Sequence, residues 1–429
     1  MDDILAALEV SADRGARLIE ACAELSQQQL DLRRWKGTEL TEALKVGSPQ
    51  TIFAAEEAGH LPKADRRNGN PTGTRLGYTL DQMIGAMEHF GTRPGRKPGD
   101  KTSILSFTNF KGGCWKTTSC WYFCSWAAMQ GYRVLAIDLD PQASLTRNMG
   151  IPPDLHTSYE DSLAPFIVEL EESTYENVKK VIRRIPHSGV DLIPGTLDLQ
   201  YVEWTLARKF IEINHEPIEE FEKHKKRVQC LTRVSEVISV VEDDYDIIVF
   251  DGTPTLGHLP LNIVLASDAV VVPVPTEMAD FCSTNAFIRL LLDQYKDYRK
   301  YFGSDFPLTD LRYLPTRFAH GGLDDEEEGD KKKRSTSSTE ILNNFIRPTF
   351  GDRVLSSVIR KHDAVMGRLG PYSRTVFEMT PGMGDIKRDS RMRATENFEQ
   401  AFKEIMETLV YPNWPSVAQN RKLMEAING

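Results

Sequence analysis

The chain has 429 residues, a length typical of two to three domains. Apolar residues make up 40% and charged residues 27%, which excludes a wholly disordered, collagen-like or disulfide-scaffold chain. Acidic side chains number 62 and basic ones 52, and the net charge of −10 argues against a surface coated with positive charge for nucleic acid or anionic membrane.

Targeting signals are not evident, so the sequence predicts a cytoplasmic protein without a membrane partner. The six cysteines form no CxxC pair and no cluster at zinc spacing, which favours a reducing compartment. The acidic start MDDILAALEV does not resemble a secretory signal. The most apolar stretch falls short of the roughly 20 residues that a membrane-spanning helix needs.

The N-terminal third divides into three parts. Residues 2–31 carry apolar side chains at helical spacing, so residues 1–35 are expected to form an amphipathic helix that packs on a second copy or on its own domain. Residues 91–101, GTRPGRKPGDK, have linker composition and place a domain boundary near residue 100. A separate domain is therefore expected over residues 36–100.

Residues 40–61 predict a helix-turn-helix within that domain. A first helix ends at Gly47, Ser48 can cap a second helix with Pro49 in its first turn, and this second helix ends at Gly59. Two helices joined by a tight turn are typical of DNA-binding domains. The alternative is a helical pair that packs in a dimer interface and exposes a solvated basic face.

Local charge favours DNA binding, because residues 63–101 hold eight basic and four acidic side chains. Side chains early on the second helix are placed to contact base edges in the major groove. Basic residues on the following hairpin are placed to contact phosphates or the minor groove. A second basic patch, before the last long helix, is placed to contact phosphates without regard to sequence. The alternative is that this second patch is only the solvent-exposed start of a helix. The three groups are Gln50 and Thr51; Arg66, Arg67 and Arg75; and Lys387, Arg388, Arg391 and Arg393.

From residue 101 to 429 the pattern changes to alternating strands and helices. Short apolar runs at 102–108, 133–138, 190–194, 246–250 and 268–273 are separated by helical stretches. This order predicts an α/β fold with a mainly parallel, doubly wound sheet. Residues 321–339 combine an acidic block, a basic block and a Ser/Thr run, which predicts a mobile charged loop.

Residues 109–118, NFKGGCWKTT, predict a phosphate-binding loop between a strand and a helix. Lys116 would reach the β- and γ-phosphates, and the hydroxyl of Thr117 would ligate Mg²⁺. The strict pattern GxxxxGK[ST] fails, because Phe110 and Trp115 occupy its glycine positions. Two further segments that carry carboxylates support the prediction.

Those carboxylates end predicted strands, at the edge of a parallel sheet where ligands bind. Asp138-Leu139-Asp140-Pro141-Gln142 ends the second strand, and Asp251 ends another after four apolar residues. Asp251 has the place of a Walker B aspartate that holds the water shell of Mg²⁺. Together the three segments predict a P-loop NTPase that binds a nucleotide.

These motifs, with Thr253-Pro254-Thr255-Leu256-Gly257, resemble the deviant Walker A ATPases of the ParA type over residues 101–410. Gly351-Asp352-Arg353-Val354-Leu355 is similar to the RepA partition proteins of repABC replicons, and residues 56–81 to their MerR-like reading heads. The resemblance implies ATP and Mg²⁺. It implies that Lys111 crosses to the nucleotide of a partner in a homodimer, that Lys116 acts within its own chain, and that Asp140 orients the attacking water.

The same resemblance assigns the remaining site residues, and Gln142 would begin a switch that reports the γ-phosphate. The nucleotide would contact Lys111, Gly112, Gly113, Cys114, Trp115, Lys116, Thr117 and Thr118, and the metal shell would involve Thr117, Asp138 and Asp251.

The function implied is replicon partition by an ATPase that binds nucleoid DNA in its ATP form and is stimulated by a ParB-type centromere-binding partner. The N-terminal domain would repress its own operon. The alternative is a transcriptional regulator whose nucleotide domain does not hydrolyse ATP, because Trp115 stands beside the phosphates. A reductase like the nitrogenase iron protein would need a cluster-ligating cysteine pair between subunits, and Cys114, Cys120 and Cys124 lie in the wrong place for one.

Overall fold

The computed structural model describes residues 10–15, 17–18, 20–21, 32–69, 73–109, 111–255, 257–302, 309–319, 337–380 and 383–419. Most of the predicted helix over residues 2–31 and most of the predicted loop over 321–339 lie outside these ranges, and the described residues 10–15, 17–18 and 20–21 are helical and mostly exposed. Residues 337–339 differ from the loop prediction, because Ser337 caps helix α14 (Ser338–Ile341) and its hydroxyl accepts a hydrogen bond from the Glu340 N–H.

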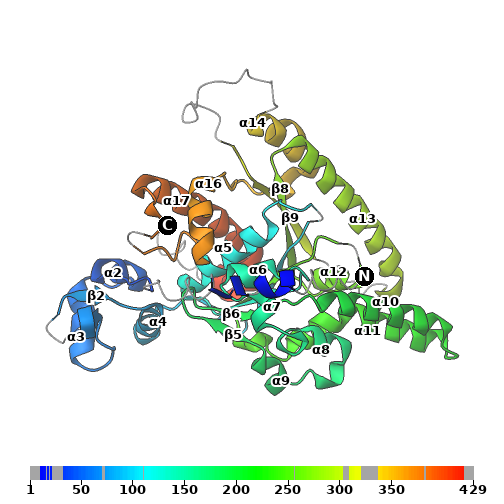
Figure 1. Cartoon of the computed structure of the whole chain (residues 1–429), viewed down its shortest axis with the longest axis horizontal. Coiled ribbons are helices and arrows are strands. Elements are labelled where there is room, and N and C mark those ends of the chain that lie inside the picture. The colour runs from blue at the N-terminus through cyan, green and yellow to red at the C-terminus, as the bar shows by residue number, and fades with distance from the viewer. Residues whose placement is uncertain are drawn as a thin grey trace.

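A seven-stranded sheet forms the centre of the molecule, in the order β5-β6-β4-β7-β3-β8-β9 (Figure 1). Every neighbouring pair is parallel except β5 and β6. The predicted mainly parallel, doubly wound sheet is therefore confirmed. The strands are β3 (Ser103–Phe107), β4 (Val134–Asp138), β5 (Arg183–Ile185), β6 (Val190–Ile193), β7 (Ile247–Asp251), β8 (Ala269–Pro275) and β9 (Asp310–Thr316).

Helices cover both faces of this sheet, which explains why its strands are almost continuously apolar. Along β4, Ala136 packs in one hydrophobic cluster, and Leu135 and Ile137 pack in another. The first cluster includes α5 (Lys116–Met129), α16 (Asp363–Leu369) and α17 (Arg388–Ile405). The second includes α8 (Ala164–Val168), α10 (Leu199–His215), α11 (Glu220–Ser239) and α12 (His258–Leu265).

The remaining helices lie at the edges and ends of the sheet. Helix α13 (Met278–Phe302) packs with β8, β9 and α14 around Phe287. The shorter ones are α6 (Ser144–Asn148), α7 (Pro153–His156), α9 (Tyr175–Lys180) and α15 (Arg347–Phe350).

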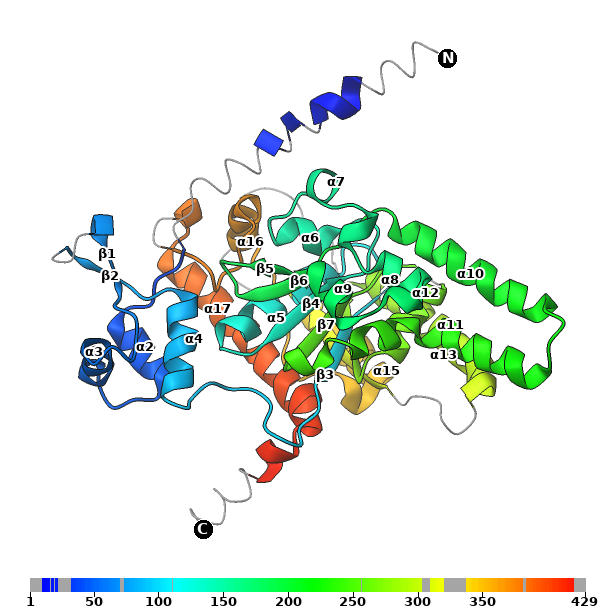
Figure 2. The same ribbon diagram turned by 90° about the horizontal axis from the view of Figure 1, so that it is seen from below.

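The N-terminal domain lies to one side of the sheet, at the left of Figures 1 and 2. Helix α2 (Gly37–Leu44) ends at Lys45, which has a left-handed φ of 52°, and α3 (Pro49–Glu57) begins directly after the extended Ser48. A two-stranded antiparallel hairpin of β1 (Asp65–Arg66) and β2 (Arg75–Gly77) follows, and α4 (Leu80–His89) completes the domain. Thr79 caps α4 by accepting a hydrogen bond from the Gln82 N–H.

This domain shares a hydrophobic core with the sheet domain. One cluster of buried residues runs from Leu40 through Leu80 and Met87 to Val190. Leu80 packs so closely on the β5–β6 turn that a Cβ at Gly189 would lie 2.7 Å from its Cδ2. The two parts therefore meet through a packed interface.

The segment predicted as a linker is held against the core. The Arg96 N–H donates to Asp246 Oδ1 at 3.0 Å, and Arg93 Nε donates to the Gly131 carbonyl at 2.9 Å. Gly95, with a φ of +140°, approaches the Asp246 carboxylate so closely that a Cβ would meet its oxygens at 2.9 Å. Glycine at this position thus allows the backbone to lie close to the core.

Candidate nucleotide site

The predicted phosphate loop leaves the carboxyl end of β3, and the buried Asn109 anchors its beginning. Asn109 Nδ2 donates to the Pro273 carbonyl at 2.8 Å and to Thr284 Oγ1 at 3.1 Å, while its Oδ1 accepts from the Lys111 N–H at 3.2 Å. The loop is thereby tied to β8 and α13. Sequence patterns did not single out Asn109, because its partners are distant in the chain.

Trp115 adopts a left-handed backbone, with a φ of 66°, at the position where the strict P-loop pattern has glycine. Gly113 is also left-handed, with a φ of 75°. A non-glycine residue in this region costs roughly 1–2 kcal/mol. The indole is half-buried and packs against the core cluster around α5, which offsets that cost. Trp115 thus preserves the turn that glycine would make.

Helix α5 begins at Lys116 without a capping side chain, so its N-terminal N–H groups can receive an anion. The Lys116 side chain is buried, and its Nζ donates to Asp140 Oδ2 at 3.2 Å and to the Gly252 carbonyl. Asp140 follows β4 and Gly252 follows β7. The structure therefore brings the three predicted segments to one point at the carboxyl edge of the sheet.

Asp251 ends β7 with its side chain fully buried. Neither of its carboxylate oxygens meets the geometry of a hydrogen bond with the described residues. Burial raises the pKa of Asp251, and the neighbouring Lys116 and the nearby Thr117 hydroxyl oppose this rise. An unpartnered buried carboxylate is costly, and a hydrated cation would satisfy it. The donor set at this edge therefore fits Mg²⁺, a cation that prefers oxygen ligands and water.

Asp138 lies opposite Asp251 in the β4–β7 register, but its oxygens are occupied. Oδ2 accepts from the Thr146 N–H at 2.8 Å and from Thr146 Oγ1 at 2.7 Å, and Oδ1 accepts from the Asp140 N–H at 3.2 Å. Asp138 thus holds residues 140–146 in place. Its place in a metal shell stays a prediction. Gln142 joins this segment through its N–H, which donates to Asp140 Oδ1 at 2.9 Å.

Lys111 forms an ion pair that the sequence did not predict. Its Nζ lies 3.3 Å from Oδ1 of Asp280, a buried residue on α13. Arg317, directly after β9, approaches the other oxygen of Asp280 at 3.6 Å and donates to the Gly113 carbonyl at 3.5 Å. Asp280 follows the carboxyl end of β8, and this placement at the same sheet edge is the one signal that could have found it.

The predicted DNA-contacting residues fall into different environments. Gln50 and Thr51 are exposed in the first turn of α3, and Arg67 is exposed beside the hairpin. Arg66 is half-buried and donates to the Gly73 carbonyl at 2.9 Å.

Arg75 is held inside the N-terminal domain. Its Nη2 donates to both oxygens of the buried Glu56 and to Tyr78 Oη, each at 2.7 Å. Its guanidinium also lies 4.3 Å from the centre of the Phe53 ring. These contacts fasten the hairpin to α3, so Arg75 differs from the predicted phosphate contact.

The second basic patch surrounds the start of α17. Lys387, Arg388 and Arg393 are exposed. Arg391 is half-buried and lines a cavity of about 670 Å³ between α17 and the N-terminal domain, together with Arg33, Arg34 and Lys36. The tertiary structure thus brings Arg391 next to basic residues of the other domain.

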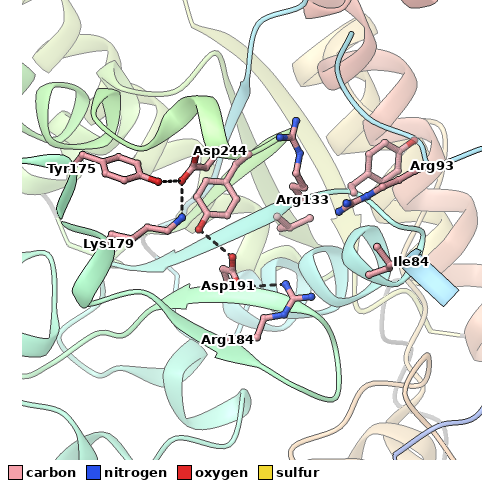
Figure 3. A pocket seen from close by; sticks show the side chains of 11 residues that line it. Ile84, Arg93, Arg133, Tyr175, Lys179, Arg184, Asp191 and Asp244 are labelled. Atoms are coloured by element: carbon pink, nitrogen blue, oxygen red, sulfur yellow. Dashed lines mark hydrogen bonds and ion pairs between the residues drawn. The ribbon is translucent and has the colours of Figure 1, made fainter. Parts of the chain in front are cut away.

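Another cavity, of about 330 Å³, lies at the amino edge of the sheet (Figure 3). Tyr175 and Lys179 both donate to Asp244, while Arg184 donates to Asp191. These charged groups satisfy one another across the cavity. The carboxyl edge, with the unpartnered Asp251, therefore remains the candidate site.

The strand–loop–helix around Lys116 and the carboxylates at adjacent strand ends define a P-loop NTPase. Residues 102–300 match the family model described as an AAA domain. The chain is 31% identical to Protein SopA of Escherichia coli strain K12, over 89% of this chain and 90% of that protein. It belongs to the ParA family of partition ATPases.

Two further comparisons agree with this family. The chain is 26% identical to a ParA family protein of Chlamydia trachomatis serovar D, over 70% of this chain and 96% of that one. A solved structure described as a partition protein has the same fold, with a TM-score of 0.61 and 18% identity over 93% of this chain and 97% of that chain. Among the described residues, no helix has the length and apolar character needed to cross a bilayer.

Proposed function

We propose that this protein is a replicon-partition ATPase that binds ATP with Mg²⁺ and acts as a homodimer in the cytoplasm. The observation that carries the proposal is the position of Lys116 between Asp140 and the Gly252 carbonyl, beside the unpartnered carboxylate of Asp251. A buried cation, a buried anion and a free helix N-terminus together suit a metal-bound polyphosphate.

Each residue of the nucleotide site would have its own role. Lys116 and the backbone N–H groups of residues 112–118 hold the phosphates, and Thr117 and Asp251 hold the metal shell. Bound Mg²⁺ would neutralise charge on the β- and γ-phosphates. Asp140 orients the attacking water, because its carboxylate is already fixed by Lys116 and by the Gln142 N–H. Lys111 leaves Asp280 and reaches the nucleotide of the second subunit.

The N-terminal domain would read DNA as a winged helix-turn-helix. Helix α3 presents Gln50 and Thr51 to the major groove, and the β1–β2 hairpin presents Arg66 and Arg67 to phosphates. This domain would bind the protein's own operator and repress its operon. Lys387, Arg388 and Arg393 would bind nucleoid DNA without sequence preference in the ATP form.

Partner-stimulated hydrolysis tests the proposal. Phosphate release is measured with the purified chain, Mg-ATP, DNA and the ParB-type protein of the same replicon. We expect slow basal turnover that rises at least about tenfold with DNA and partner together. Tight ATP binding without turnover under every condition would instead support the regulator with a non-hydrolysing nucleotide domain.

Operator binding tests the DNA-reading domain separately. The double variant Arg66→Ala/Arg67→Ala should weaken operator binding at least about tenfold and lower its salt dependence, while ATP affinity stays unchanged. Lys387→Ala/Arg388→Ala is the matched control, since it should leave operator binding intact and weaken only binding to random DNA. Equal loss in both double variants would contradict the division between the two surfaces.

A further inference from the structure

The cavity of about 670 Å³ between α17 and the N-terminal domain has walls from both domains. Side chains between residues 32 and 39 and from β2 line one side, and side chains between residues 376 and 380 and from α17 line the other. Its volume lies within the range of about 300–1,000 Å³ that is typical of pockets for small ligands. None of the described residues that line it belongs to the candidate nucleotide site, so it is a separate place for a ligand.

Apolar side chains form much of the wall of this interdomain cavity. Val376 and Met379 are buried, whereas Leu32, Leu76 and Met392 are between 36% and 43% exposed. Single exposed apolar residues need no explanation, but three of them around one cavity do. An occupant with an apolar body would cover these three side chains.

The charge of the interdomain cavity is positive, because four basic and two acidic residues line it. Arg33 is half-buried, its Nη1 donates to the Phe377 carbonyl at 2.5 Å, and its guanidinium lies 4.9 Å from the centre of the Trp35 ring. Burial lowers the pKa of Arg33, the charge of Glu39 opposes this shift, and the charge of Arg391 lowers the pKa further. Two like charges in one cavity repel each other, and a bound anion would relieve that repulsion.

The basic side chains differ in how far the protein already occupies them. Arg34 donates to the Leu32 carbonyl at 3.1 Å and pairs with Asp65 at 2.9 Å. The guanidinium of Arg391, by contrast, forms no hydrogen bond or ion pair with the residues that the structure describes. A guanidinium can bind a carboxylate or a phosphate through two parallel hydrogen bonds. Arg391 is therefore available to an anionic ligand.

The two acidic residues of the wall favour a small anion over nucleic acid. Glu39 and Glu396 are exposed, so the closely spaced phosphates of a DNA strand would be repelled by both carboxylates. A ligand that carries only one or two negative charges is repelled less. Contacts to DNA phosphates also need no apolar wall, whereas this cavity has one.

We propose that the interdomain cavity binds a small organic anion, in which a carboxylate, sulfonate or phosphate group is joined to an apolar body. The anionic group contacts Arg391 close to the charge of Arg33, and the apolar body covers Leu32, Leu76 and Met392. This site goes beyond the proposed function, because binding there needs neither ATP nor DNA. Since both domains line the cavity, the bound anion also holds the N-terminal domain against the sheet domain.

The test uses the full chain and 8-anilinonaphthalene-1-sulfonate, an anion with an apolar body whose fluorescence rises in apolar surroundings. Titrations with and without saturating Mg-ADP distinguish the interdomain cavity from the nucleotide site. The wild type with Mg-ADP should bind this probe saturably, with a Kd below about 100 μM. Decanoate and decyl phosphate should displace the probe, and the tighter of the two identifies the preferred anionic group. Decanol, which lacks the charge, and pyrophosphate, which lacks the apolar body, should not displace it.

A pair of charge reversals on α17 locates the binding site. Arg391→Glu removes the available guanidinium and should weaken probe binding at least about tenfold. Arg388→Glu is the matched control, because Arg388 is exposed three residues earlier on the same helix and does not line the cavity. The control should bind the probe like the wild type. Thermal unfolding checks that both variants are folded.

Four outcomes would overturn the proposal. The first is unchanged probe binding in Arg391→Glu, or an equal loss in Arg388→Glu. The second is displacement by decanol as readily as by decanoate, which would show that the cavity has no preference for anions. The third is displacement by pyrophosphate or by a short DNA duplex but not by decanoate, which would assign the surface to nucleic acid. The fourth is a wild type that binds ATP but not the probe, which would leave the proposed function intact.

Discussion

Lys111 and Asp280 form an ion pair that joins the phosphate loop to helix α13, with 3.3 Å between Nζ and Oδ1. Asp280 is buried and also faces Arg317, whereas the Lys111 side chain is 38% exposed. In the proposed dimer Lys111 would have to leave this position. In that dimer Asp280 would compete with the nucleotide of the second subunit for the same lysine.

Replacing Asp280 should make ATP-dependent dimerisation easier. A partly exposed ion pair contributes up to about 1 kcal/mol, which is a factor of about five in an equilibrium constant. Asp280→Asn should lower the ATP concentration at half-maximal dimerisation by up to this factor, measured by light scattering. Asp280→Glu, which keeps the charge, is the control. A higher ATP requirement in Asp280→Asn would show that Asp280 holds Lys111 in its productive position.

Lys116→Ala should remove nucleotide binding. The substitution takes away the buried cation beside Asp140 and Asp251, so phosphates would meet two carboxylates without compensation. We expect ATP affinity to fall at least about 100-fold, measured by isothermal titration calorimetry. Lys111→Ala, at the exposed end of the same loop, should keep affinity within a few-fold but lose dimerisation and turnover. Retained affinity in Lys116→Ala would mean that the loop does not bind phosphates.

The left-handed backbone of Trp115 predicts an unusual order of stabilities. Trp115→Gly and Trp115→Ala both delete the indole, but only alanine keeps the cost of the positive φ. The glycine variant should be more stable than the alanine variant by about 1 kcal/mol, although glycine usually weakens folded structure. Urea unfolding of the two variants measures this difference. Greater stability of Trp115→Ala would place the residue outside the left-handed region.

Arg75→Ala should destabilise the N-terminal domain. The buried Glu56 would lose its charged partner, at a cost of about 2 kcal/mol or more. Urea unfolding and operator binding should both worsen. The second change in Arg75→Ala/Glu56→Gln removes the unpaired charge and should restore part of the stability. Arg67→Ala, at an exposed neighbour, should leave unfolding unchanged, and an equal loss there would contradict the structural role of Arg75.

His187 predicts a loss of stability in acid. Burial, and then the charge of Arg374, lower its pKa from 6.5 to about 3. Between these values the unfolded chain binds a proton that the folded chain does not, so stability falls as pH falls from about 6.5. The slope from this group is up to about 1.4 kcal/mol per pH unit. His187→Gln should lose less stability between pH 7 and 5 in urea unfolding, and an unchanged pH dependence would contradict the prediction.

The sequence by itself predicted most strands of the sheet and a phosphate-binding loop at its carboxyl edge. Five of the seven strands were recognised, because strands buried on both faces read as continuous apolar runs. Strand β5 contains two arginines and β9 contains Arg312 and Pro315, so both were missed. Lys116, Asp140 and Asp251 could be singled out because strand ends and loops of this kind leave local patterns in the chain, and the structure brings Lys116 and Asp140 into contact.

Only the tertiary structure decided which partner each charged side chain has. Arg66, Arg67 and Arg75 look alike in the sequence, yet Arg75 alone is paired with the buried Glu56. Likewise, the pairing of Lys111 with Asp280 depends on β3 and β8 being neighbours in the sheet. Local patterns report the preferences of a segment, whereas its ion pairs and its exposed faces depend on which distant segments pack beside it.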